Sequence, residues 1–151
     1  MGLDMYLYRN LYQNGNVLNI TPQDEFNNDK FAKLLKRATT SNASYLHPTV
    51  SVNVAYWRKA NAIHQWFISH CGDGVDECQD IEVSLEDLRD LKDTCERILQ
   101  APNDIDLMER LLPTQDGFFF GDTDLNNADT LSAYLDDVKY TNDILSEDRR
   151  I

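Results

Sequence analysis

The sequence predicts an α+β fold in which three to four helices pack on a small, mainly antiparallel sheet. Apolar and polar residues alternate along 2–9 and 49–56, which is the pattern of half-buried strands. Apolar residues recur every three or four positions along 56–71, 85–99 and 127–147, which is the pattern of amphipathic helices. A chain of 151 residues is long enough to bury one self-sufficient core, so we expect a single globular domain over its whole length.

The N-terminal third is expected to begin with a hairpin. Gly2–Arg9 alternates Leu and Met against Asp and Tyr, and Asn14-Gly15-Asn16 is typical of the turn that follows such a strand. Val17–Ile20 would be the second strand of the hairpin. The next dipeptide, Thr-Pro, suits the N-cap and first position of a helix over 22–37.

The centre of the chain is expected to run from a strand directly into a helix. Thr49–Tyr56 carries the clearest strand signal, because three valines alternate with Thr, Ser and Asn. The helix predicted over Tyr56–Cys71 holds both tryptophans and two of the three histidines. Gly72 stands where a left-handed C-cap would end this helix. The apolar stripe of the helix consists of Tyr56, Ala60, Ile63 and Phe67.

The remainder of the chain is expected to supply two more strands and three more helices. Ser84 and Asp87 have the spacing of a capping box, which predicts the start of a helix. Three consecutive phenylalanines between two glycines indicate a buried strand. The predicted strands are 78–83 and 117–121, and the predicted helices are 85–100, a short helix within 101–112, and 127–147.

The composition limits the classes of function. A formal net charge of −12 and a pI near 4.4 argue against direct binding of nucleic acid, because phosphates would be repelled. No apolar run approaches the roughly 20 residues that span a bilayer and no signal peptide is present, so we expect a cytosolic protein without a membrane partner. Three cysteines without a C-x-x-C pair indicate neither a disulfide framework nor a metal site, and no cofactor is expected.

One group of side chains in the predicted helix over 56–71 suits a small anionic ligand such as a nucleotide. An indole, an amide and an imidazole recur at i, i+4 and i+7 on its second face. Arg58 and Lys59 would lie in its first turn, where cations are unfavourable beside the helix dipole unless an anion is close. We expect the indoles to stack a base, the cations to neutralise phosphate, and the amide and imidazole to hydrogen-bond. The predicted ligand-binding residues are Trp57, Arg58, Lys59, Asn61, His64 and Trp66.

The last predicted helix supports an alternative hypothesis. Carboxylates line its second face, so the chain could be an acidic inhibitor that occupies the basic groove of a host nuclease or CRISPR effector. The stripe imitates a duplex only crudely, because seven residues of helix advance about 10 Å while DNA carries a charge about every 1.7 Å. The partner-binding residues of this alternative are Asp129, Asp136, Asp137, Asp143 and Glu147.

A second alternative is a small hydrolase or transferase that acts on nucleotides. His64 would be its general acid or base, and Asp73 or Asp76 would orient the imidazole. The sequence has no phosphate-binding loop, dinucleotide fingerprint, H-E-x-x-H motif or G-x-S-x-G motif. We therefore favour binding over catalysis.

Four short sequence motifs are scattered over most of the chain. They are Gly2-Leu3-Asp4-Met5-Tyr6-Leu7; Tyr56-Trp57-Arg58-Lys59-Ala60-Asn61 with Ile63-His64 and Trp66-Phe67; Asp73-Gly74-Val75-Asp76; and Leu112-Pro113-Thr114-Gln115 with Gly117–Gly121. Together they resemble a family of small bacteriophage-encoded proteins. The resemblance implies a protein made in the host cytoplasm, where countering host defence is a frequent role, and it carries over no catalytic residue. Homo-oligomer formation stays open.

Overall fold

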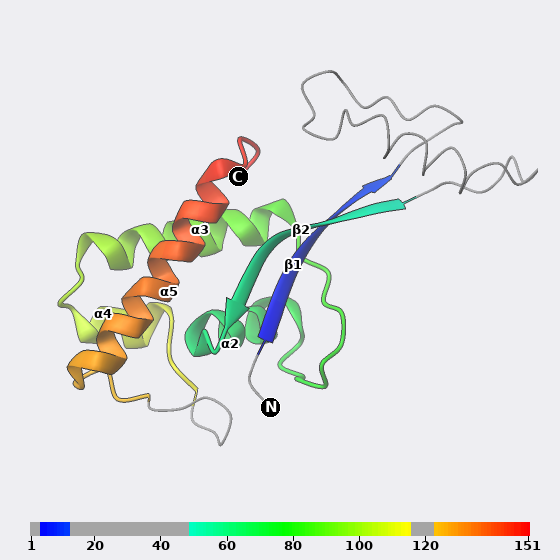
Figure 1. Ribbon diagram of the computed structural model, residues 1–151. Coiled ribbons are helices and arrows are strands. Elements are labelled where there is room, and N and C mark those ends of the chain that lie inside the picture. The colour runs from blue at the N-terminus through cyan, green and yellow to red at the C-terminus, as the bar shows by residue number, and fades with distance from the viewer. Residues whose placement is uncertain (1–3, 13–48, 116–122) are drawn as a thin grey trace, which may run out of the picture. The chain divides into compact units, whose positions relative to one another are not determined.

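The computed structural model describes residues 4–12, 49–115 and 123–151, and it confirms the α+β class. Within these residues β1 (Asp4–Tyr12) and β2 (Thr49–Arg58) form an antiparallel two-stranded sheet (Figure 1). The described helices are α2 (Asn61–Cys71), α3 (Leu85–Gln100), α4 (Ile105–Leu111) and α5 (Ala128–Glu147). The predicted strands at 17–20 and 117–121 and the predicted helix at 22–37 lie outside the described residues.

The chain divides into two compact units, one made of residues 1–7 and 55–151 and the other of residues 8–54. The boundary between them falls inside both strands. The described helices, and every site residue predicted from the sequence, belong to the first unit. The packing of that unit therefore positions the candidate site. The expectation of one domain stays a prediction.

Within the first unit, the two strands alternate between the core and the surface. Met5 and Leu7 of β1 pack against the core, and Ala55 and Trp57 of β2 are buried in it. The residues between them are exposed, because successive side chains of a strand point to opposite faces of the sheet. The alternation predicted for the start of the chain is confirmed over Asp4–Leu7. For 49–56 the strand is confirmed, but its predicted face is wrong, because the valine Val54 is 38% exposed while Ala55 is buried. Burial of Trp57, which shares its face with Ala55, sets this register.

The predicted start of the central helix is wrong, because β2 continues through Arg58 and α2 begins only at Asn61. Both the strand pattern and the helical pattern fit the sequence at this point. The period of two runs on past Tyr56, with Trp57 buried and Arg58 exposed. Burial of the large Trp57 ring in the core of the unit therefore favours the strand over the helix.

Lys59 and Ala60 turn the chain from β2 into α2. Lys59 has a φ of 59°, in the left-handed region, which costs roughly 1 to 2 kcal/mol for a residue with a side chain. Ala60 has a φ of −75° and a ψ of 77°, and the Asn61 backbone N–H donates to the Lys59 carbonyl over 2.9 Å, which is an inverse γ-turn. Arg58 and Lys59 therefore precede the helix, and the predicted conflict between these cations and its dipole does not exist.

Helix α2 ends at Cys71 as predicted, but Gly72 is not a left-handed cap, because its φ is −107°. The site requires glycine for space instead. A Cβ atom at Gly72 would lie 2.9 Å from Cδ1 of Ile81 and 3.1 Å from the Ile68 carbonyl oxygen, so a side chain here would crowd both neighbours and require them to shift. The left-handed residues of this turn are Asp73 and Gly74, with φ of 54° and 73°.

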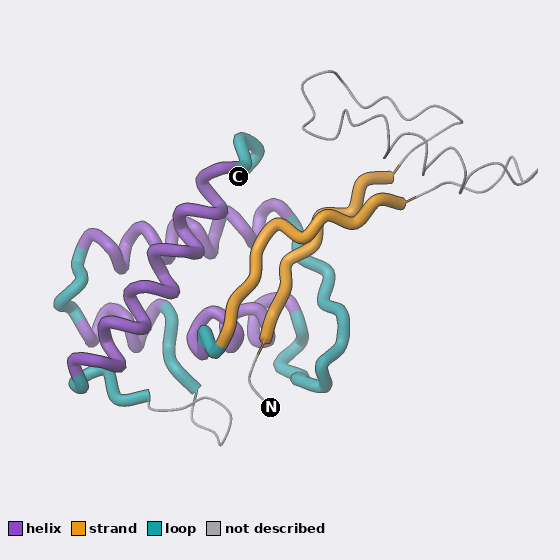
Figure 2. The backbone as a smooth tube through the Cα atoms, in the orientation of Figure 1, coloured by secondary structure: helices purple, strands orange, loops and turns teal. Residues whose placement is uncertain are grey.

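The strand predicted over 78–83 is also wrong, since residues 72–84 form a loop (Figure 2). Cys78 has a φ of 58°, which breaks an extended strand at its first predicted residue. In the part of the chain that the structure describes, no strand pairs with this segment. Its apolar residues anchor a loop instead: Ile81 is half-buried beside Gly72, and Val83 packs against the core.

The predicted capping box at the start of α3 is confirmed. The Ser84 Oγ accepts the Asp87 backbone N–H over 3.1 Å, and the Asp87 carboxylate accepts the Ser84 backbone N–H over 2.8 Å. The Ser84 hydroxyl also donates to this carboxylate, and these hydrogen bonds lower the pKa of Asp87. The Asp104 carboxylate caps α4 in a similar way by accepting the Leu107 backbone N–H over 2.9 Å. Local polar contacts therefore set where both helices begin.

Helix α5 begins at the Asn127 cap, whose side-chain oxygen accepts two backbone N–H groups of the first turn. It packs against α3 and contacts α2, while α4 contacts α3 (Figure 1). The most deeply buried apolar side chains come from all four of these helices and the residue after α4: Ile63, Leu91, Ile98, Met108, Leu112, Val138 and Leu145. No helix among the described residues is long and apolar enough to span a bilayer.

Candidate functional site

Trp57, the predicted stacking residue, lies in the core and is only 3% exposed. Its indole Nε1 donates a hydrogen bond of 2.9 Å to Oγ1 of Thr141 on α5. Its ring packs against Phe67 and, edge to face, against Tyr140, with centroid distances of 5.8 and 6.2 Å. The structure thus uses Trp57 to join β2 to α2 and α5, and no face of the ring is open to a base.

Trp66 on α2 is buried in the same way and is 5% exposed. Its ring stacks on the His70 imidazole, with centroids 4.5 Å apart and an interplanar angle of 10°. It also meets Phe67 edge to face at 5.3 Å. Both indoles therefore have packing partners inside the protein, and the two predicted stacking plates serve the core.

Asn61, the first residue of α2, holds the backbone of Gln115 with both ends of its amide. Its Nδ2 donates to the Gln115 carbonyl over 2.7 Å, and its Oδ1 accepts the Gln115 backbone N–H over 2.7 Å. The residue is only 8% exposed, so a buried polar side chain is fully satisfied by this clamp. The predicted ligand contact of Asn61 is occupied by the chain that follows α4.

The two predicted cations are both exposed, at the end of β2 and in the turn before α2. Arg58 continues the outer face of β2. Lys59 lies in the strained left-handed turn and lines a cavity between α2 and α5, which we call the α2–α5 cavity. Of the residues predicted for the ligand, Lys59 and Asn61 therefore meet at one cavity, whereas neither tryptophan, nor Arg58, nor His64 lines it.

The α2–α5 cavity has a volume of about 320 Å³, at the lower end of the range for small-molecule sites. Its wall combines apolar side chains with hydroxyl groups, one ammonium group and two carboxylates. The carboxylates belong to Asp129 and Asp137, which the sequence assigns to a different hypothesis. The lining residues are Lys59, Asn61, Ala62, Ile63, Thr114, Leu125, Asp129, Thr130, Ala133, Tyr134, Asp137 and Val138.

The charges around this cavity favour a cation over an anion. Burial, together with the charge of neighbouring Asp136, raises the pKa of the Asp137 carboxyl from 3.8 to about 6. Among the described residues, no hydrogen bond or ion pair to the Asp137 carboxylate is found, and Lys59 lies more than 4.0 Å from either carboxylate. A half-buried carboxylate without a counterion therefore faces the cavity.

His64 contacts Asp76, one of its two predicted partners. The imidazole Nε2 lies 3.0 Å from Oδ2 of Asp76, and the histidine is 9% exposed. Asp73 is exposed in the left-handed turn after α2. The dyad lines neither of the two cavities described here. The geometry suits a histidine oriented by a carboxylate.

The acidic stripe predicted for the last helix is exposed in the structure. Asp129, Asp136, Asp143 and Glu147 follow one another at intervals of seven, seven and four residues, which keeps them on one face of α5. That side of the helix is opposite the buried one, which consists of Tyr134, Val138, Thr141 and Leu145. We call the four exposed carboxylates the acidic face. Asp137 lies outside it, half-buried at the cavity.

Exposed tyrosines are the feature that sequence reasoning missed. Tyr140 lies within the acidic face and is 39% exposed, and its hydroxyl accepts the Tyr56 backbone N–H over 3.3 Å. The Tyr56 ring lies 4.9 Å from that of Tyr6 on β1, and its hydroxyl donates to the Asp4 carboxylate over 2.6 Å. The period of two in β1 was a signal for Tyr6, because it sets Tyr6 opposite Met5 and Leu7. It gave no signal for Tyr56, which shares its face with the alternating valines and was assigned to an apolar stripe.

Two of the three cysteines, Cys71 and Cys95, have thiols whose pKa is raised by burial. Burial raises the pKa of Cys71 to about 11 and that of Cys95 to about 12, which keeps both thiols protonated and weakly nucleophilic at neutral pH. Within the residues that the structure describes, no group of three or more His, Cys, Asp or Glu side chains could hold a metal ion.

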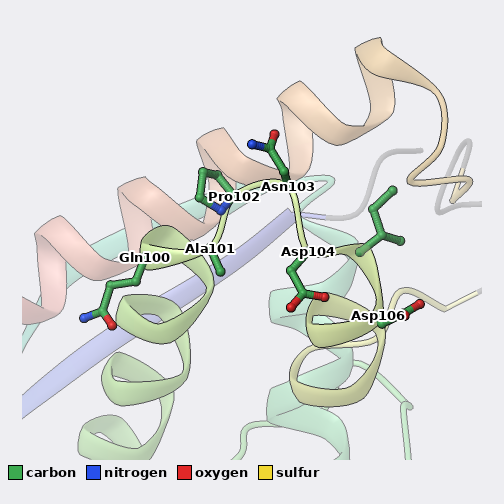
Figure 3. A pocket seen from close by; sticks show the side chains of 7 residues that line it. Gln100, Ala101, Pro102, Asn103, Asp104 and Asp106 are labelled. Atoms are coloured by element: carbon green, nitrogen blue, oxygen red, sulfur yellow. The ribbon is translucent and has the colours of Figure 1, made fainter.

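A wider hollow of about 660 Å³ surrounds the connection from α3 to α4, residues 100–106 (Figure 3). Gln100 and Asp106 lie at its two ends, and no site residue predicted from the sequence lines it. The Asp104 carboxylate inside it serves the N-cap of α4. The hollow is the space around a turn between helices, so the α2–α5 cavity and the acidic face are the candidate sites. Comparison of the chain with protein-family models, with curated proteins and with solved structures gave no match in any of the three.

Proposed function

We propose that this chain is a non-catalytic binding protein that docks on a basic partner protein through the acidic face of α5. The observation that carries the proposal is the exposure of all four carboxylates on the side of α5 opposite the core. The chain as a whole carries a net charge of −12, so it approaches a basic partner under long-range attraction.

The aromatic content of this surface supports docking over mere solubility. Tyr140 stands among the carboxylates of the acidic face, half-exposed, with its ring braced against Trp57. Tyrosine is enriched in protein interfaces, and a ring already held in place loses little conformational entropy on binding. An acidic rim around a rigid aromatic anchor is the surface that a basic, partly apolar groove would accept.

A small anionic ligand has less support from the geometry. Both indoles are buried, the Asn61 amide is engaged with Gln115, and the cavity beside Lys59 contains two carboxylates. An anion placed there would face more negative than positive charge. A basic partner on the acidic face would instead meet charges of the opposite sign.

The resemblance to small bacteriophage-encoded proteins suggests the class of partner. In a host cytoplasm, a defence protein that holds nucleic acid in a basic groove, such as a nuclease or CRISPR effector, has the complementary charge. Occupation of that groove by the acidic face would counter host defence without any chemical step.

The contact of His64 with Asp76 favours a second candidate, a hydrolase or transferase that acts on nucleotides. Its test is turnover of a nucleoside triphosphate panel by the purified chain. Loss of turnover in His64→Gln with unchanged folding would support the enzyme. Absence of turnover in the unaltered chain would exclude this use of the dyad.

The docking proposal is tested by charge removal on matched helices. The test variant carries Asp136→Asn, Asp143→Asn and Glu147→Gln on the acidic face. The control carries Asp90→Asn, Asp93→Asn and Glu109→Gln, three exposed acids of α3 and α4, so the change in net charge is identical. Each protein is used to capture partners from bacterial lysate, and affinity for the purified partner is then titrated at 50 and 300 mM salt.

We expect capture of a basic protein, about tenfold weaker binding at low salt for the test variant, and little change for the control. The same partner should lose affinity in high salt. Equal loss in both variants would reduce the effect to net charge and contradict a docking face. A stoichiometric nucleotide-like adduct in native mass spectrometry, with no protein captured, would restore the small-ligand hypothesis instead.

A further inference from the structure

The α2–α5 cavity contains a carboxylate that neither the fold nor the proposed docking surface uses. Asp137 departs from the acidic face and points its charge toward a space of about 320 Å³. Partial burial of a carboxylate without a counterion is unfavourable. Among the described residues, no hydrogen bond or ion pair to the Asp137 carboxylate offsets this cost. Such a group at a cavity wall is typical of a binding site.

The charges that surround Asp137 can be named from each element at the cavity. Lys59 comes from the turn before α2, and Asp129 and Asp136 come from α5, of which Asp136 does not line the cavity. Helix α2 contributes Asn61, Ala62 and Ile63, none of which titrates. The lining therefore holds one positive and two negative groups and accepts a positive charge.

The other lining residues define the rest of the ligand. Ile63, Leu125 and Val138 are buried apolar side chains, and two alanines leave room beside them. The Tyr134 hydroxyl donates to the Leu112 carbonyl over 2.9 Å and the Thr114 hydroxyl to the Thr123 carbonyl over 3.3 Å, so both keep only acceptor capacity. Apart from Lys59 and the Thr130 hydroxyl, the wall thus offers apolar groups and hydrogen-bond acceptors, which suit a donor cation on an apolar stem.

We propose that the α2–α5 cavity binds an ammonium group carried on a short apolar stem, with the Asp137 carboxylate as its counterion. This site shares only Asp129 with the acidic face, and its proposed ligand goes beyond the proposed docking function. The same chemistry occurs in a free alkylamine and in a lysine side chain of a protein, and the experiment separates these two sources.

The test is a titration of the full chain, followed by the backbone amide signals of Ala62, Ile63 and Ala133 in NMR spectra. The probes are n-butylammonium for a free amine, N-acetyl-lysine methylamide for a lysine side chain, and n-butanol as the uncharged control. For ligands of this size, we expect saturable shifts with millimolar dissociation constants. Saturation by either cation supports the site and identifies the source, whereas shifts by neither overturn it.

Variants then assign the counterion. Asp137→Asn should weaken binding of the cation that saturates at least tenfold, while Asp136→Asn, the same charge change one residue away, should weaken it less than threefold. Ala133→Leu keeps every charge and fills the cavity, so it should also abolish the shifts. Equal binding by Asp137→Asn, or equal binding by n-butanol, would overturn the proposal.

The pH dependence gives a further readout. Because the pKa of Asp137 is raised to about 6, its carboxyl is largely protonated at pH 5, and affinity there should be about tenfold weaker than at pH 7.5. The acidic-face variant serves as a second control, because none of its three substitutions lines the cavity. If that variant binds the cation normally but loses its protein partner, the two proposals are separated.

Discussion

The indole Nε1 of Trp57 donates a hydrogen bond of 2.9 Å to Oγ1 of Thr141, and this contact fastens β2 to the middle of α5. Thr141 in turn donates to the Asp137 carbonyl, one turn earlier in α5, over 2.8 Å. Both side chains are buried, so the hydrogen bond is shielded from water. It places the most prominent aromatic residue of the sequence in a structural role and fixes the helix that carries both candidate sites.

Replacement of Thr141 by valine keeps the shape of the side chain and leaves the indole N–H without an acceptor. We expect Thr141→Val to lower the free energy of unfolding by roughly 1 to 3 kcal/mol, measured by urea denaturation. Thr141→Ser retains the hydroxyl and should lose less. Trp57→Phe should lower the free energy of unfolding less in the Thr141→Val variant than in the unaltered chain. Strict additivity of the two substitutions would show that the hydrogen bond contributes nothing.

The Asn61 clamp should be a second point of sensitivity. Asn61→Ala removes both hydrogen bonds to Gln115 and leaves its backbone N–H and carbonyl without these partners, so we expect a loss of roughly 2 kcal/mol in unfolding free energy. Asn103→Ala, in the exposed turn before α4, is the matched control and should change stability by less than about 0.5 kcal/mol. A similar small effect at Asn61 would mean that water replaces the clamp at little cost.

Local signals predicted the helices that have strong caps. Ser84 with Asp87 marked the start of α3, and polar residues before 128 marked the start of α5. The junction of β2 and α2 was mispredicted because no residue there caps a helix: Ala60 precedes α2 and makes no side-chain hydrogen bond. Periodicity alone had to decide, and two periods overlap over 56–60. The strand is favoured over the helix because it buries Trp57 in the core. That burial depends on the tertiary packing and cannot be inferred from the local sequence.

The candidate site shows the same limit. The sequence offered Asp73 or Asp76 as the partner of His64 without placing either within reach, and the structure brings Asp76 into contact. The meeting of Lys59 with Asp137 at one cavity depends on how α2 packs against α5, and the two residues are far apart in sequence. Asp137 looked like a member of the acidic stripe, and only the rotation of α5 against the core separates it from Asp136.

The capping box of α3 should contribute stability in a pH-dependent way. Ser84→Ala removes the side-chain cap and should lower the free energy of unfolding at pH 7 by about 1 kcal/mol. The pKa of Asp87 is lowered in the folded state, so its contribution is present above the unfolded value near 3.8 and is lost as pH falls through the folded value. The difference between Ser84→Ala and the unaltered chain should therefore shrink in acid.

Ser146→Ala is the control for this prediction, because Ser146 is exposed inside α5 and caps nothing. Alanine has the higher helix propensity, so this variant should be as stable as the unaltered chain or slightly more so. Urea denaturation at pH 7 and below pH 3 checks both variants. A loss for Ser84→Ala that is unchanged in acid would contradict the role of the Asp87 carboxylate.

Asp137 should have the opposite dependence on pH. Its pKa is raised in the folded state from 3.8 to about 6, so folding favours the protonated form. The destabilising contribution is absent below about pH 3.8, grows as pH rises, and is complete above about pH 6. Asp137→Asn should therefore raise the free energy of unfolding at pH 7.5 by roughly 1 kcal/mol, a value reduced for partial solvent screening. The gain should vanish by pH 4.

Asp136→Asn removes the same charge from an exposed position and should change stability only slightly at either pH. If n-butylammonium occupies the cavity, it neutralises the Asp137 carboxylate, and the unaltered chain should then approach the stability of Asp137→Asn at pH 7.5. Equal stability of Asp137→Asn and the unaltered chain at pH 7.5 without the amine would mean that water already solvates this carboxylate. In that case burial would not drive cation binding, and the cavity would need another source of affinity.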